Sequence, residues 1–152
     1  MAIRKFGIQH MLPPHIELLS GPGCPVCVTG RSAIDHIIAL ARIPGNVIAT
    51  YGDLIRIPGS VSDLNRERAA GADVRIVFST LDALALAKKH PDLNVIFPGI
   101  GFETTTPSTA VAILEAQAQN IPNFQVLSLH KLMPPAMGAL IEQGVKIDGF
   151  IG

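Results

Sequence analysis

Two cysteines form the pattern in this sequence with the clearest chemical potential. Cys24 and Cys27 are the only cysteines of the 152 residues, and they lie three positions apart in the segment GPGCPVC, residues 21–27. At this spacing two sulfur atoms can close a disulfide bond or hold one metal ion. The glycines, among them Gly23, let another group approach the backbone closely, and the prolines stiffen the loop. We expect both cysteines at or just before a helix N-terminus, where a thiolate is favoured.

The spacing alone leaves several interpretations of the pair open. Two cysteines can simply be small buried residues in a tight turn. A structural zinc site usually takes four ligands, so zinc would need histidines or a second chain. A thioredoxin-like dithiol agrees with the spacing, but C-x-x-C recurs in unrelated proteins. We favour a redox-active or metal-binding pair because the cysteines lie together in a stiff loop of glycine and proline.

The composition describes a globular chain and excludes several partners. Hydrophobic residues make up 48% of the chain and charged residues 16%, which rules out a disordered chain. Lys plus Arg equals Asp plus Glu at 12 each, and Trp is absent, so neither nucleic acid nor an anionic membrane surface is expected as a partner. We expect no secretory signal and no membrane-spanning helix. The expected location is the cytoplasm, where thiols are kept reduced.

Short apolar runs alternate with helical patterns along the chain. We expect strands at residues 46–50, 73–78, 94–97, 124–129 and 146–151, with an earlier one before the cysteine loop at 16–19, and helices at residues 31–43, 61–70, 81–89, 107–118 and 135–143. Apolar strands that alternate with helices predict an α/β fold, with parallel sheets flanked by helices. We expect a first α/β lobe over residues 1–99, which carries the C-x-x-C loop, and the beginning of a second, truncated lobe over residues 100–152.

Residues suited to binding follow the expected strands. They include Gly52 and Asp53, the glycine-rich loop 99–105, and the pair His130 and Lys131. The carboxyl ends of parallel strands lie at one edge of a sheet, and ligands bind at this edge in open α/β folds. His130 is therefore a candidate binding residue beside the expected cleft.

Glu103, in the loop 99–105, has two interpretations. A carboxylate at a helix N-terminus stabilises the helix dipole, whereas a carboxylate in a cleft can carry a proton. The sequence contains neither G-x-G-x-x-G nor a Walker-type phosphate loop, so no nucleotide is expected.

Several short segments stand in a characteristic order along the chain. They are GPGCPVC, TYGD, IPGS, GADVR, GFETT, HKLMPPA and DGFIG, at residues 21–27, 50–53, 57–60, 71–75, 101–105, 130–136 and 148–152. In this order they resemble the HypD family, whose members act in the maturation of [NiFe]-hydrogenases. The resemblance covers essentially the whole chain, and the ordered set is far more specific than any single motif.

The resemblance implies a fold, a cargo and partners. HypD-like proteins form a complex with a small HypC-type chaperone, and together they hold the iron on which cyanide and carbon monoxide ligands are assembled. A HypE-type protein is the cyanide donor. The family fold has two α/β lobes around a cleft and a further region with a [4Fe-4S] cluster. By this resemblance Cys24 and Cys27 form the redox dithiol of the cleft and are ligands or neighbours of the iron, while Glu103, Thr104 and Thr105 face the cleft from the second lobe.

The implied chemistry agrees with the residue types. Thiolates are soft ligands suited to iron that carries cyanide and carbon monoxide. A dithiol can also supply two electrons by closing to a disulfide. Backbone N–H groups of glycine-rich loops can donate hydrogen bonds to cyanide nitrogens, as such groups bind anions elsewhere. The candidate residues for binding this ligand set are Gly23, Glu103, Thr104, Thr105 and His130.

The chain also departs from the family pattern. Family members carry an upstream Cys-Gly-Thr-His motif, whose cysteine is central to iron binding, and a cysteine-rich C-terminal region; this sequence has neither. Two cysteines cannot ligate a [4Fe-4S] cluster within one chain. We expect a fragment, a split gene product or a chain whose start is misplaced. The alternative functions are a stand-alone thiol–disulfide oxidoreductase and an inactive remnant, so enzymatic activity is left open.

Overall fold

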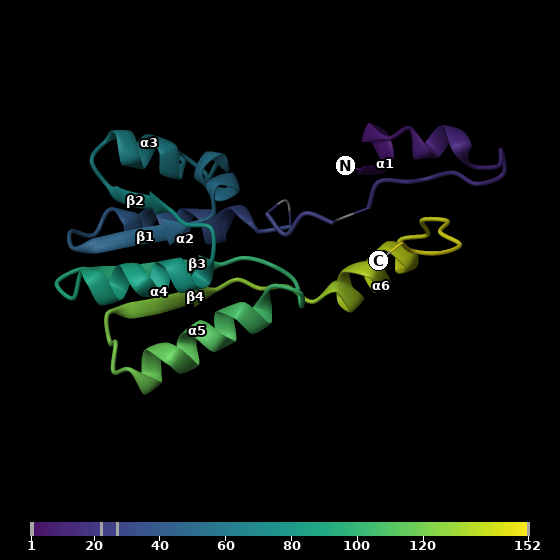
Figure 1. Cartoon of the computed structure of the whole chain (residues 1–152). Helices are drawn as coiled ribbons and strands as arrows, with labels where there is room; N and C mark the ends of the chain where they lie inside the picture. Colours follow the sequence, from purple (N-terminus) through teal and green to yellow (C-terminus); the bar gives the residue numbers. More distant parts are fainter. Residues whose placement is uncertain (1, 22, 27, 152) are drawn as a thin grey trace.

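Four parallel strands form a sheet at the centre of the structure. The computed structural model describes residues 2–21, 23–26 and 28–151 (Figure 1). The strands are β1 (Asn46–Thr50), β2 (Asp73–Ile76), β3 (Asn94–Gly99) and β4 (Phe124–Ser128), in the spatial order β2-β1-β3-β4. All three neighbouring pairs are parallel, so the predicted α/β fold is confirmed.

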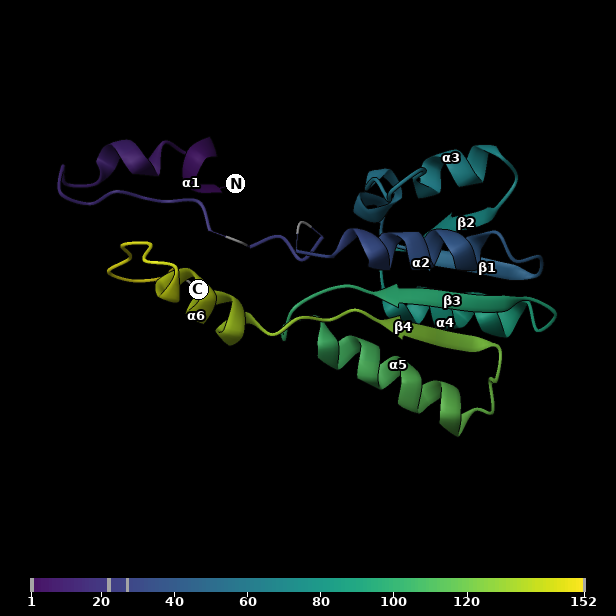
Figure 2. The same ribbon diagram turned by 180° about the vertical axis from the view of Figure 1, so that it is seen from behind.

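Helices cover both faces of this sheet (Figures 1 and 2). α2 (Arg31–Ala41) and α3 (Leu64–Ala69) pack on one face, whereas α4 (Thr80–Lys89) and α5 (Thr106–Ala118) pack on the other. Because side chains alternate along a strand, Ile48 of β1 enters the first core and its neighbour Val47 enters the second. The remaining helical segments are α1 (Ala2–Lys5), α6 (Met133–Glu142) and the 3-10 helices η1 (Ile8–Met11) and η2 (Gly52–Arg56).

An apolar stripe at helical spacing anchors α2 on the sheet. Its buried positions are Ile34, Ile37, Ile38 and Ala41. Directly after the helix, Arg42 donates hydrogen bonds from Nε and Nη2 to the two carboxylate oxygens of Glu67 in α3, each at 2.8 Å. These contacts fix the helix that follows the cysteine loop.

Two of the expected strands are not formed in the part of the chain that the structure describes. Residues 16–19 and 146–151 are irregular, and no strand lies beside them to accept their backbone hydrogen bonds. The expected strand 73–78 ends at Ile76. The expected helix 61–70 begins only at Leu64, because the Asp63 side chain caps it by accepting a hydrogen bond of 2.9 Å from the Arg66 backbone N–H.

β4 lies beyond the boundary that we expected between residues 99 and 100. It pairs with β3 from Val95 opposite Phe124 to Gly99 opposite Ser128. Segments on both sides of the expected boundary therefore contribute to the same sheet. The division into lobes 1–99 and 100–152 stays a prediction.

α1 and α6 lie apart from the sheet, beyond the carboxyl ends of its strands (Figures 1 and 2). α6 contains no buried residue, and the Ile141 side chain within it is 57% exposed. Neither α6 nor any other helix in the described ranges is long and apolar enough to cross a membrane.

Candidate functional site

The carboxyl edge of the sheet gathers most of the segments that the sequence singled out. η2 follows β1, the loop 99–105 follows β3, and His130 follows β4, and these strands are parallel. α2 connects the cysteine loop to β1 and runs back along the sheet, so its N-terminus lies at the same edge (Figure 1). The expected functional edge is therefore present. The cysteine loop lies there because α2, which follows it, begins at this edge, and not because the loop follows a strand.

The cysteine loop is a series of tight turns ahead of α2. The Gly23 N–H donates to the Gly21 carbonyl at 2.9 Å, and the Thr29 hydroxyl donates to the Pro25 carbonyl at 2.9 Å. Cys24 is exposed. Cys27 lies outside the described residues, so the geometry of the pair stays a prediction. α2 begins only at Arg31, which places Cys24 further from the helix in sequence than we expected.

Glu103 holds the start of α6. Both of its carboxylate oxygens accept from the Met133 backbone N–H, at 2.9 and 3.1 Å. The next two residues are prolines, which have no N–H, so Met133 offers the backbone donor of this first turn. The carboxylate thus occupies a helix N-terminus, and its role as a cleft acid stays a prediction.

The two threonines beside Glu103 differ in their surroundings. Thr104 is exposed, whereas Thr105 is partly buried and its hydroxyl donates to the Phe102 carbonyl at 3.0 Å. The Thr106 hydroxyl donates to the same carbonyl at 3.0 Å. Thr105 therefore stabilises the loop itself, whereas Thr104 is exposed to solvent.

His130 is partly buried at the end of β4. Its Nδ1 lies 3.1 Å from the Ser128 hydroxyl oxygen, and its Nε2 lies 3.5 Å from the hydroxyl oxygen of Thr109, a buried residue of α5. Burial of the ring lowers the pKa of His130 below its ordinary value. Burial thus favours the neutral form of the imidazole.

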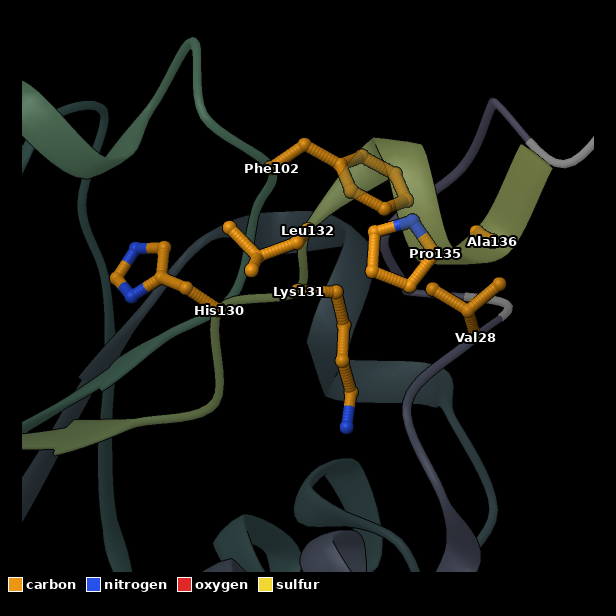
Figure 3. A pocket seen from close by; sticks show the side chains of 7 residues that line it. All are labelled: Val28, Phe102, His130, Lys131, Leu132, Pro135 and Ala136. Atoms are coloured by element: carbon orange, nitrogen blue, oxygen red, sulfur yellow. The ribbon is translucent and has the colours of Figure 1, made fainter. Parts of the chain in front are cut away.

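A pocket of about 370 Å³ joins three of the motifs (Figure 3). Val28 directly follows the cysteine loop, Phe102 directly precedes Glu103, and His130 follows β4. The other lining residues are Lys131, Leu132, Pro135 and Ala136. The structure therefore brings the surroundings of the cysteine loop, the Glu103 loop and His130 to one apolar hollow with a single cationic side chain on its wall.

Sequence reasoning missed the apolar members of this pocket. Phe102 lies within the motif GFETT and Leu132 within HKLMPPA, but neither was singled out as a binding residue, and Val28 directly follows the cysteine loop. Within the described residues no group of three or more His, Cys, Asp or Glu side chains is arranged to hold a metal ion. Cys27 is not among those residues, so this finding does not bear on the cysteine pair.

Comparison with known proteins agrees with the order of motifs. A family model described as "HypD: Hydrogenase formation hypA family" matches residues 1–152. Proteins named hydrogenase maturation factor HypD are 47% identical in Rhizobium leguminosarum bv. viciae, 45% in Rhodobacter capsulatus and 43% in Escherichia coli. Each alignment covers 99% of this chain but only 40–41% of the relative.

By its fold and its site, the chain is an α/β protein with a cysteine loop at the carboxyl edge of a parallel sheet. The family match over its whole length makes the assignment more specific: the chain belongs to the HypD family. It spans about two fifths of the length of the curated relatives it matches.

Proposed function

We propose that this chain acts in [NiFe]-hydrogenase maturation, as a scaffold on which iron receives its cyanide and carbon monoxide ligands. The observation that carries the proposal is the match to relatives named hydrogenase maturation factor HypD, at 43–47% identity over nearly the whole chain. Iron is the cargo of this process. The proposed location is the cytoplasm, where a dithiol is kept reduced.

Cys24 and Cys27 are the proposed iron-binding and redox pair. Thiolate sulfur is a soft ligand suited to iron that carries cyanide and carbon monoxide. When two thiols close to a disulfide they release two electrons and two protons, so the same pair can reduce a bound group. The exposure of Cys24 supports this role, because a thiol must be accessible to meet its cargo.

The residues around the pocket are proposed to surround the ligands on iron. Backbone N–H groups near Gly23 and the exposed Thr104 hydroxyl can donate hydrogen bonds to cyanide nitrogens. Glu103 can carry a proton if it leaves the Met133 N–H, and Thr105 and His130 shape the loop and the wall of the pocket.

The proposed partners are a HypC-type chaperone and a HypE-type cyanide donor. Neither nucleic acid nor a membrane is proposed as a partner. The [4Fe-4S] cluster of the full-length family does not fit this chain, because two cysteines cannot supply the usual four ligands.

Infrared spectroscopy tests the scaffold proposal directly. The chain would be purified without oxygen after co-expression with HypC-, HypE- and HypF-type proteins. We expect cyanide and carbon monoxide bands that disappear in Cys24→Ala and in Cys27→Ala. Ser20→Ala, an exposed small residue just before the same loop, is the matched control and should keep the bands.

Two outcomes would count against the proposal. Bands that persist in both cysteine variants would remove the thiolates from iron binding. No bands for this chain, with bands for a full-length relative treated identically, would show that the segment does not hold the iron by itself.

A stand-alone thiol–disulfide oxidoreductase is the second candidate, favoured by the exposed Cys24 in a C-x-x-C loop. Such an enzyme would reduce a generic protein disulfide without any partner, and Cys24→Ser would abolish the reaction. A scaffold would be inert in this assay until a HypC-type protein is present. Inertness in both this assay and the infrared experiment would indicate an inactive remnant.

A further inference from the structure

His130 lies against Gly99, the last residue of β3, and against the loop that follows this strand. A Cβ atom placed on Gly99 would lie 2.7 Å from Cε1 and 3.3 Å from Nδ1 of the imidazole, and Cβ atoms in real structures essentially never come within 3.0 Å of such an atom. A Cβ atom on Gly101 would lie 3.4 Å from Cδ2 of the same ring. The imidazole therefore fills the space that a side chain at Gly99 would need.

The ring is held in this place from several sides. Its two nitrogens face the hydroxyl oxygens of Ser128, at 3.1 Å, and Thr109, at 3.5 Å. The backbone on either side of it is bonded to the same loop: Leu129 N–H donates to the Gly99 carbonyl and Lys131 N–H to the Gly101 carbonyl, each at 2.9 Å. The imidazole thus belongs to the residue between two backbone hydrogen bonds that continue the pairing of β3 and β4.

The supported loop leads directly to Glu103. Two residues after Gly101, the Glu103 carboxylate accepts from the Met133 N–H and so ties the loop to α6. Phe102, between these residues, is buried and lines the pocket together with His130 (Figure 3). A shift of the loop at Gly99 or Gly101 would move Phe102 and Glu103 with it.

We propose that His130 is a positioning residue, whose ring sets the path of residues 99–103 and thereby places Glu103 against the start of α6. The inference deepens the proposed function, since it gives His130 a role in the site that does not require contact with iron. Both ring nitrogens already face hydroxyl groups, which leaves the position of the ring as its main contribution.

Amide hydrogen exchange and NMR spectra of the ¹⁵N-labelled, metal-free chain test this role. In His130→Ala we expect the Met133 amide to exchange at least about tenfold faster, as expected when a hydrogen bond to a charged group is lost. The amide signals of residues 101–105 should shift, while those of β1 and β2 should not. His36→Ala, which removes an exposed imidazole from α2, is the matched control and should leave all these signals in place.

A double-mutant cycle separates positioning from general damage. Gly99→Ala should also speed exchange at Met133, because its methyl group displaces the ring. Added to His130→Ala, Gly99→Ala should cause little further change, since the ring it would strike is gone. Gly101→Ala is the contrast: its methyl group meets the Thr105 side chain, so its effect should add to that of His130→Ala.

Either of two results would overturn the inference. One is a Met133 exchange rate and loop spectrum in His130→Ala that match those of His36→Ala. The other is an effect of Gly99→Ala that is equal with and without His130. If His130→Ala does not fold, His130→Gln and Gly99→Ala give the same comparison. Because no iron is present, failure here would leave the thiolate proposal standing, and the infrared result would leave this one standing.

Discussion

The side chain of Glu103, in the loop that follows β3, is held by a hydrogen bond from the backbone. Its carboxylate accepts the Met133 N–H through both oxygens, at a helix start where two prolines follow. A carboxylate that accepts a backbone N–H forms a charge-assisted hydrogen bond, which is roughly twice as strong as a neutral one. Loss of this contact would therefore loosen the start of α6.

For a single residue, the structure predicts that the pKa of His130 is lowered and that stability depends on pH accordingly. Burial lowers its pKa below the ordinary value of 6.5, so the unfolded chain binds a proton more readily than the folded chain does. This contribution to stability is present above the unfolded pKa and is lost as the pH falls through the folded pKa. NMR titration of the ring protons should give a value below 6.5.

The matched variant for this titration is His130→Gln. It should flatten the acid loss of thermal stability, whereas His36→Gln should not. A ring pKa at or above the ordinary value would contradict the burial seen at the end of β4.

At the scale of elements, α2 and α3 are joined by an ion pair. Hydrogen bonds from Arg42 and, to a smaller extent, Ser62 lower the pKa of Glu67 to about 2. The Glu67 side chain is only 10% exposed, so it depends on Arg42 for compensation of its charge. The pair holds the helix whose N-terminal end carries the cysteine loop.

Arg42→Met should destabilise the chain in a manner that depends on pH. Because the folded pKa of Glu67 is depressed, its contribution is full above about 4.5 and is lost as the pH falls towards about 2. The melting temperature of the variant should be a few degrees lower near neutral pH, and the gap should close in acid. Thermal unfolding followed by circular dichroism measures this, with Arg56→Met, an exposed residue of η2, as the control. A gap that does not change with pH would rule out the ion pair as its cause.

Gly30 is the N-cap of α2 and has φ −62° and ψ 146°. Proline prefers this φ. Gly30→Pro should therefore stabilise the chain by about 0.4–1 kcal/mol, because it restricts the unfolded state. Gly45→Pro is the contrast: Gly45 has φ 86°, which proline cannot adopt, so this variant should be clearly destabilised. Urea unfolding measures both, and a loss of stability in Gly30→Pro would indicate that its N–H is needed.

At the scale of the molecule, stability is concentrated in the two cores on either face of the sheet. The largest fully buried side chains, such as Ile34, Ile48 and Phe97, belong to β1, β3 and the helices that cover them. α1 and α6 lie outside these cores (Figure 1). The pocket at the carboxyl edge therefore has one wall on the segments that follow β3 and β4 and one wall on α6, which has no buried residue of its own.

Two identical substitutions test this distribution of stability. Ile48→Ala removes a side chain that is 0% exposed and should cost about 2–5 kcal/mol. Ile141→Ala removes one that is 57% exposed in α6 and should change stability by less than about 0.5 kcal/mol. Urea unfolding of both variants gives the comparison. Comparable losses would mean that α6 belongs to the same cooperative core.

Local patterns in the sequence were sufficient for most of the elements. The spacing of Ile34, Ile37, Ile38 and Ala41 predicted α2, and apolar runs between loops predicted β1 to β4, because each depends on residues close in sequence. The same patterns were wrong at 16–19 and 146–151. An apolar run becomes a strand only if another strand pairs with it, and that is decided by distant parts of the chain.

The sequence by itself determined the α/β class, the family through its ordered motifs, and the edge of the sheet at which those motifs gather. Only the tertiary structure decided that Glu103 caps α6, that His130 fills the space above Gly99, and that Val28, Phe102 and Leu132 share one pocket. The physical reason is that these contacts join residues far apart in the chain. The segments that follow β3 and β4 meet because these two strands are paired in the sheet. The spacing of residues along the sequence does not reveal such contacts, because they form only when the strands pair.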